Sequence, residues 1–188
     1  MSAWMATVER LHQLLAELVF TDLDGQHCRV DLAFDRWAEW ASRVRVQEKT
    51  VYLIGNGASA SMASHFAADL AKNGHLHTQV FSDICLVTAV SNDINFSEIY
   101  AEPLRRRGKK GDLLVAISSS GKSPNILRGV EVARSLGLTV VTLTGFNGDN
   151  PLRRLGELNA YLPARTYGEA ETAHAAILHC WMDMVEVK

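Results

Sequence analysis

The sequence predicts an α/β protein with a single doubly wound parallel sheet. Several short stretches are apolar throughout rather than alternating, which indicates strands that are buried on both faces. From residue 50 onward these stretches alternate with segments of helical periodicity, as expected for repeated strand–helix units. The chain has 188 residues, the length of one domain, so we expect an α/β core over 49–188 and two additional helices within 1–48.

The two expected N-terminal helices precede the first strand. Apolar residues recur at helical spacing over 2–19 and again from about 30 to 46. With Trp4, Trp37 and Trp40, these helices carry more apolar surface than one face of a sheet can cover. We therefore expect residues 1–48 to contribute to oligomerisation. The segment 21–27 between the helices is predicted to be a turn, in preference to a metal site made by its two aspartates.

The remaining elements follow in chain order. Strands are predicted at 51–54, 78–81, 113–117, 138–144 and 158–162. Helices are predicted at 61–72, at 98–107, from Pro124 onward and from Gly168 to the C-terminus. The segment 84–90 leads into a loop at 91–96 that we expect to be polar and irregular. The central element of this series is the strand at 113–117.

The central strand ends in a serine-rich loop over 118–123, with four serines in six positions. Ser123 followed by Pro124 is typical of a helix start. The unpaired N–H groups and positive dipole end of that helix, together with the hydroxyls, can bind a phosphate without an arginine. Gly121-Lys122-Ser123 matches the end of a P-loop, but Ala116 lies where that motif needs glycine. The sequence therefore predicts a monophosphate site and not a Walker-type nucleotide site.

A second loop, Gly55 to Ala60, also joins a strand to a helix. It fits the G-x-G-x-x-A dinucleotide pattern, which is a weak signal by itself. Asp69 lies within the following helix and Asp83 comes late in the chain, so the acidic residue expected to bind a ribose is missing and NAD is not expected. Because the carboxyl ends of parallel strands share one edge of the sheet, the two loops are predicted to face one pocket.

Two helices each carry a histidine and a carboxylate. His65 and Asp69 are four residues apart and share a helix face. Glu171 and His179 are two turns apart on the last helix. Together they supply the base, the acid and the metal ligands that an aldose–ketose isomerisation can use. The alternative is a network of ion pairs that needs no metal.

Composition limits the partners and the compartment. The formal net charge is −2 and 21% of the residues are charged, so binding of nucleic acid or of an anionic membrane is not expected. The three cysteines are isolated, which argues against disulfides or a zinc ribbon and fits a reducing cytoplasm. No apolar run approaches the length of a membrane span and no export signal is evident, so we expect a soluble cytoplasmic protein.

Taken in order, these motifs resemble the sugar isomerase (SIS) domain family, specifically its phosphoheptose isomerase branch. The resemblance implies a flavodoxin-like sheet, a homotetramer with active sites between subunits, and conversion of sedoheptulose 7-phosphate to glycero-manno-heptose 7-phosphate. The branch also contains a non-enzymatic protein, the DnaA initiator-associating protein, so a phosphosugar-binding or protein-interaction module is the alternative. The segments that carry the resemblance are Gly55 to Ala60, His65 to Leu70, Ser91 to Asp93, Ala116 to Ser123, Leu143 to Gly145 and the histidine-bearing C-terminal helix.

The resemblance also implies roles for single residues. Asp69 would be the base and His179 the catalytic histidine of an enediol mechanism, and Asp93 would touch the sugar. The phosphate pocket would consist of Asn56, Ser59, Ser118, Ser119, Ser120 and Ser123, and a zinc ion would be held by His65, Asp69, Glu171 and His179.

Three positions depart from the family pattern. Asp69 replaces a glutamate, Glu171 replaces a glutamine, and the arginine usually found one turn beyond the base is absent, with Lys72 and Asn73 nearby. Two carboxylates and two imidazoles form a donor set that suits a divalent metal such as zinc.

Overall fold

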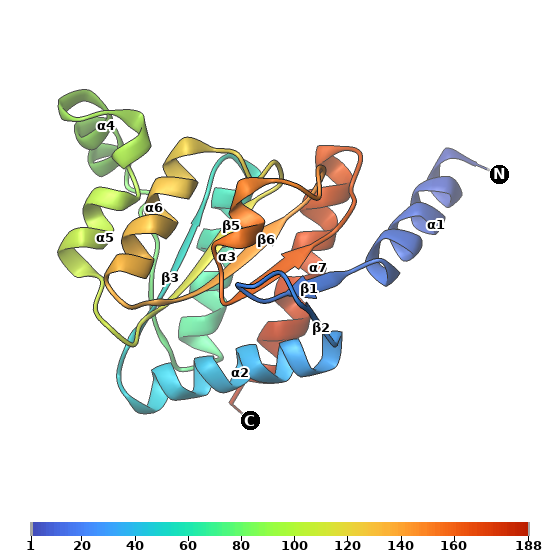
Figure 1. Cartoon of the computed structure of the whole chain (residues 1–188), viewed down its shortest axis with the longest axis horizontal. Coiled ribbons are helices and arrows are strands. Elements are labelled where there is room, and N and C mark those ends of the chain that lie inside the picture. Colours follow the sequence, from blue (N-terminus) through green and yellow to red (C-terminus); the bar gives the residue numbers. More distant parts are fainter. Residues whose placement is uncertain (1, 188) are drawn as a thin grey trace.

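A computed structural model describes residues 2–187 and contains one sheet in the order β2-β1-β7-β6-β5-β3-β4 (Figure 1). Five of the strands are parallel, and in chain order their arrangement is 2-1-3-4-5, which is the flavodoxin-like order. The predicted fold class is therefore confirmed. The parallel strands are β3 (Thr50–Gly55), β4 (His77–Gln79), β5 (Leu113–Ser118), β6 (Thr139–Thr144) and β7 (Leu158–Tyr161).

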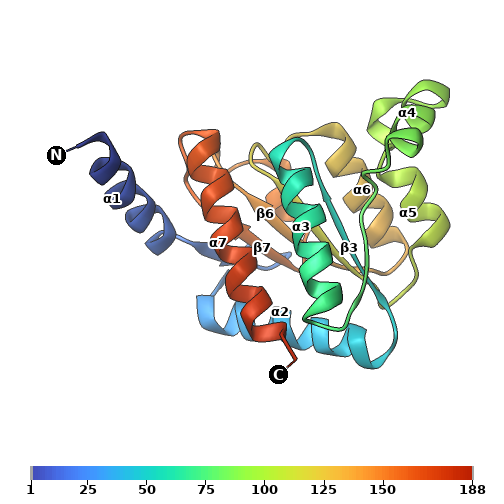
Figure 2. The ribbon, with the colours of Figure 1, turned by 180° about the vertical axis from the view of Figure 1, so that it is seen from behind.

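Helices cover both faces of the sheet, and each face has its own apolar core. Along β3, Val51 and Leu53 belong to one core while Tyr52 and Ile54 belong to the other, which explains why the strand is apolar throughout. One face is covered by α2 (Val30–Val46), α3 (Ala58–Lys72) and α7 (Tyr167–Val185) (Figure 2). The other face is covered by α5 (Ala101–Arg107) and α6 (Pro124–Ser135), with α4 (Ile84–Asp93) beyond them (Figure 1) and with 3-10 turns at Phe96–Glu98 and Pro151–Arg154.

The two N-terminal helices differ in how they pack. α2 belongs to the main core, where the Trp37 ring is fully buried and stacks on Trp181 with 4.3 Å between ring centroids. α1 (Ala3–Ala16) projects from the body (Figure 1), and Trp4 on it is 72% exposed. Trp37 is therefore a core residue, and of these two helices it is α1 that leaves a row of apolar side chains uncovered.

Two segments differ from the sequence expectation. The predicted turn at 21–27 is the tip of a hairpin made by β1 (Val19–Thr21) and β2 (His27–Cys28), and β1 pairs antiparallel with β7. Because these strands have three and two residues, they are too short to show an alternating pattern in the sequence. Their antiparallel pairing makes the sheet mixed at this edge. The Asp22 carboxylate accepts hydrogen bonds from backbone N–H groups of the same turn, as is common for aspartates in turns.

The second difference lies in α4. Residues 91–93 were expected in an irregular loop but form the last turn of α4, which begins after the N-cap Asp83. The Asp83 carboxylate accepts a hydrogen bond from the Leu86 N–H at 3.0 Å. None of the helices within residues 2–187 is both long enough and apolar enough to cross a membrane.

Candidate functional site

The serine loop is held in shape by close contact with another loop. Gly121 adopts a positive φ of +61°, and a Cβ atom there would lie 2.0 Å from Asn150 Oδ1. Its N–H donates to the Ser118 carbonyl at 3.0 Å and its own carbonyl accepts from the Leu152 N–H at 3.2 Å. Glycine is therefore required at this position, and the turn from β5 into α6 is fixed by contacts on both sides.

The hydroxyl groups of this loop differ in their partners. Ser118 Oγ accepts from the Gly121 N–H at 3.2 Å, and Ser120 Oγ accepts from the Lys122 N–H at 3.3 Å. Ser123 is the N-cap residue of α6, yet its hydroxyl makes no capping hydrogen bond. Pro124 has no N–H, and the N–H groups of Ile126 and Leu127 donate to the Ser123 carbonyl. At the start of α6, the Asn125 N–H and the Ser123 hydroxyl are the groups suited to an anion.

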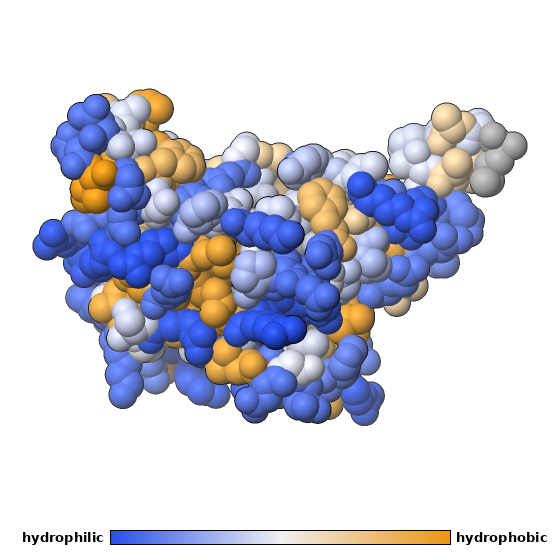
Figure 3. Space-filling model, turned by 45° about the horizontal axis from the view of Figure 1, so that its top comes forward, coloured by the Kyte–Doolittle hydropathy of each residue, from blue (hydrophilic) through white to orange (hydrophobic). Residues whose placement is uncertain are grey.

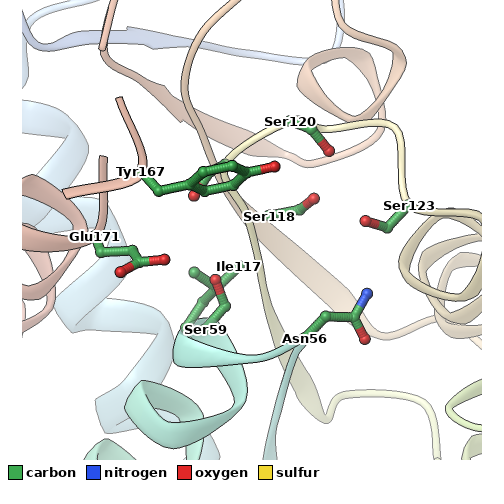
Figure 4. Close-up of a pocket in the computed structure, with 9 residues that line it drawn as sticks. Asn56, Ser59, Ile117, Ser118, Ser120, Ser123, Tyr167 and Glu171 are labelled. Atoms are coloured by element: carbon green, nitrogen blue, oxygen red, sulfur yellow. The ribbon is translucent and has the colours of Figure 1, made fainter. Parts of the chain in front are cut away.

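These serines line a cavity at the carboxyl edge of the sheet (Figure 4). All six residues predicted for the phosphate pocket contribute to it. Two further polar residues of the lining, Tyr167 and Glu171, come from the start of α7. The complete lining is Asn56, Ser59, Ile117, Ser118, Ser119, Ser120, Ser123, Tyr167 and Glu171.

The two predicted loops are tied together directly. The side-chain amides of Asn56 and Asn125 exchange two hydrogen bonds, at 3.0 and 2.8 Å. The Tyr100 hydroxyl donates to the Gly55 carbonyl, and burial raises the pKa of this phenol, so the hydroxyl keeps its proton. The Asn56 amide therefore joins the β3–α3 loop to α6, in addition to lining the cavity.

A second cluster lies on the packed helices α3 and α7. His65 Nε2 is 3.4 Å from Asp69 Oδ2, and the His179 ring lies 5.9 Å from the His65 ring between centroids. The His179 ring also packs edge-on against Phe66. Three of the four residues predicted for acid–base or metal chemistry are thus brought together.

The cluster and the serine cavity are separate within one chain. His65, Asp69 and His179 do not line the cavity, whereas Glu171 does. Ser59 and Asp69 are ten residues apart on α3, which corresponds to roughly 15 Å along the helix axis. Asp93, expected to touch the sugar, is an exposed residue at the end of α4 whose carboxylate accepts a hydrogen bond from Asn92, and it also lies outside the cavity lining.

The arrangement of these side chains does not fit a zinc ion in a single chain. Among residues 2–187 no group of three or more His, Cys, Asp or Glu side chains is placed so that it could hold a metal ion. Glu171 lines the serine cavity instead of facing His65 and Asp69. The zinc site stays a prediction, and we derive no chemical step through a metal.

Two residues near the site were given no role from the sequence, Tyr167 and His174. Tyr167 stands four residues before Glu171, so helical spacing alone would have placed it on the same face. His174 is fully buried, and neither of its ring nitrogens makes a well-formed hydrogen bond among the described residues. Burial lowers the pKa of His174 to about 4, and the Thr144 backbone offsets this only in part. It is a packed, neutral histidine outside the cavity lining.

The serine-lined cavity lies at the switch point of a flavodoxin-like sheet, the place where α/β domains of this class bind their ligands. Comparison with known proteins identifies the family. The model of the SIS domain family matches residues 31–145, and the chain belongs to that family.

Curated relatives of the chain include phosphoheptose isomerases. That of Coxiella burnetii (strain RSA 331 / Henzerling II) is 32% identical over 158 residues, covering 80% of this chain and 79% of the relative. That of Shewanella denitrificans is 29% identical over 187 residues, covering 95% of each. Among solved structures, the phosphoheptose isomerase GmhA from Neisseria gonorrhoeae has a TM-score of 0.82 at 26% identity and covers 98% of this chain and 96% of that one.

Proposed function

We propose that this chain is an aldose–ketose isomerase acting on a phosphosugar. The observation that carries the proposal is the serine-lined cavity at the start of α6, which offers hydroxyls and the positive end of the helix dipole to one phosphate. The names of its relatives support the same reaction class. Sedoheptulose 7-phosphate, the substrate that the family resemblance implies, is the first to test.

The proposed mechanism passes through an enediol. Asp69 takes the proton from C1 of the ketose and returns it to C2, while His179 moves a proton between the oxygens O2 and O1 on the opposite side. A carboxylate and an imidazole suit these steps because both exchange protons near neutral pH when suitably placed. The serine loop contributes by holding the phosphate, which fixes the position of the distant carbon atoms.

The separation of the cluster from the cavity supports assembly of the active site between subunits. We propose a homotetramer in which the cavity of one chain and the histidine cluster of another act on the same substrate. The exposed apolar side chains of Trp4, Met5 and Val8 on α1 are suited to contact a partner.

The activity is tested by incubating the purified protein with sedoheptulose 7-phosphate, once with added zinc and once with a chelator. We expect an aldose product to form. Equal rates under both conditions would assign the chemistry to the side chains, and a rate that requires zinc would restore the metal prediction. Absence of product in both would contradict this substrate.

The second candidate is a phosphosugar-binding module without turnover, as in the DnaA initiator-associating protein named by the resemblance. The observation that favours it is that Asp69 and His179 do not line the cavity of a single chain. A module of this kind would bind the phosphosugar while no deuterium from the solvent entered C2.

A further inference from the structure

The lining of the serine cavity carries a negative charge. Of the residues within 2–187 that line it, Glu171 is the one with a formal charge, and that charge is negative. The partial positive charge at the start of α6 offsets the phosphate. Glu171 lies beyond the first turn of α7, where the helix dipole has little effect, so its carboxylate repels a bound phosphate unless the ligand brings a positive group.

Glu171 is not used to stabilise the fold. The nearby Glu169 pairs with Arg10 at 3.5 Å and accepts a hydrogen bond from the Arg165 N–H at 2.8 Å. No ion pair among residues 2–187 includes Glu171, whose side chain points into the cavity (Figure 4). Within the described part of the chain, this carboxylate faces the cavity without an ion-pair partner and is available to a cation.

The Tyr167 ring lies beside this carboxylate. The two residues are four positions apart on α7, and both side chains border the cavity (Figure 4). The Tyr167 ring is held edge-to-face against Phe146, with centroids 5.0 Å apart and an angle of 84° between the rings. An aromatic ring next to a carboxylate is a combination that binds an ammonium group, through a cation–π contact and a charged hydrogen bond.

We propose that Tyr167 and Glu171 form an ammonium subsite, and that the cavity selects phosphosugars that carry an amino group. The phosphate binds to the serine loop and the ammonium group binds between the carboxylate and the ring. The proposal rests on the phosphosugar part of the proposed function and narrows its substrate class. It concerns binding and adds no chemical step.

The test compares ligands that differ only by an ammonium group. Calorimetry at neutral pH, with a chelator present so that no metal can bridge Glu171 and the phosphate, would use glucosamine 6-phosphate against glucose 6-phosphate. A second pair would be galactosamine 6-phosphate against galactose 6-phosphate. We expect the amino member of each pair to bind at least tenfold more tightly, because a hydrogen bond to a charged partner is among the stronger ones.

Variants separate the two side chains. Glu171→Gln keeps the size and removes the charge, so the ratio within each pair should fall close to one. Tyr167→Ala should lower the ratio and Tyr167→Phe should restore it, since phenylalanine keeps the ring face. Glu186→Gln, at the far end of α7, is the matched control and should leave the ratio unchanged.

The outcomes distinguish this proposal from the proposed function. If glucose 6-phosphate binds as tightly as glucosamine 6-phosphate, or if Glu171→Gln leaves the ratio unchanged, there is no ammonium subsite and the phosphosugar function still stands. If neither the four hexose phosphates nor sedoheptulose 7-phosphate binds more tightly than inorganic phosphate, both proposals are overturned.

Discussion

At the residue scale, we predict that Ser119 and Ser120 contribute directly to phosphate binding. Replacing both by alanine should weaken binding of a phosphosugar at least tenfold, because each lost hydrogen bond to a charged group is worth roughly 1.5–3 kcal/mol. The free energy of unfolding in urea should change by about 0.5 kcal/mol or less, since both side chains line a cavity and the Ser120 hydroxyl bonds within its own loop. Ser42→Ala, on the exposed side of α2, is the control. Unchanged affinity in the double variant would place the phosphate elsewhere.

His174 makes stability depend on pH. Its pKa is lowered to about 4 in the folded protein, so the unfolded chain takes up the proton first as the pH falls below about 6.5. The stabilisation is fully present above about pH 6.5 and is lost as the pH falls through about 4. The difference between the two pKa values corresponds to about 3 kcal/mol of unfolding free energy. No discount for solvent is needed, because the side chain is fully buried.

Urea unfolding between neutral pH and pH 4 measures this dependence. In His174→Asn the fall in unfolding free energy with decreasing pH should be clearly shallower than in the parent. His12→Asn, on the exposed surface of α1, should behave like the parent. Equal slopes in the parent and in His174→Asn would show that another group carries the acid sensitivity.

At the level of secondary structure, α2 contributes to the core mainly through Trp37. Trp37→Ala should lower the free energy of unfolding by about 3–5 kcal/mol, because it removes a fully buried ring stacked on Trp181. Trp40 is only partly buried, so Trp40→Ala should cost clearly less. Similar losses from the two changes, measured by urea unfolding, would contradict the assignment of Trp37 to the core.

Local patterns were sufficient to predict most elements and the serine loop. The strands β3, β5 and β6 are buried on both faces, so their apolar runs are visible in the sequence, and Ser123-Pro124 marks the start of α6 by local capping rules. The hairpin β1–β2 was missed because it has only three and two residues in its strands, and its stability comes from pairing with β7.

The histidine–carboxylate set shows where local patterns stop. Helical spacing predicted correctly that His65 and Asp69 share a face, because that is a property of one helix. It could not predict that Glu171 would line the serine cavity while His179 packs against Phe66 further along α7. That outcome depends on how α7 packs against α3 and against the serine loop.

For the whole molecule, we expect four chains to assemble into a tetramer. Besides α1, apolar side chains are exposed around α4, where Ile84, Ile94 and Phe96 are more than half exposed and where Figure 3 shows apolar residues at the upper left. We expect light scattering at micromolar concentration to give the mass of four chains. Replacing Trp4, Met5 and Val8 together by serine should lower that mass and the turnover rate, while the circular dichroism spectrum stays that of the parent.

A monomeric mass for the parent would contradict the tetramer. It would also remove the shared active site, and the histidine cluster and the serine cavity would then have to act separately.

The central claim, that the chain isomerises a phosphosugar with Asp69 as the base, is tested most directly by deuterium exchange. The protein is incubated in deuterated water with sedoheptulose 7-phosphate, and in parallel with the phosphosugar that binds most tightly in calorimetry. We predict that deuterium enters C2 of the aldose with the parent, and that Asp69→Asn binds the same ligands with at least a hundredfold slower incorporation, in line with the usual contribution of a general base. Tight binding by the parent without any deuterium at C2 would contradict the claim and would identify the protein as a phosphosugar-binding module.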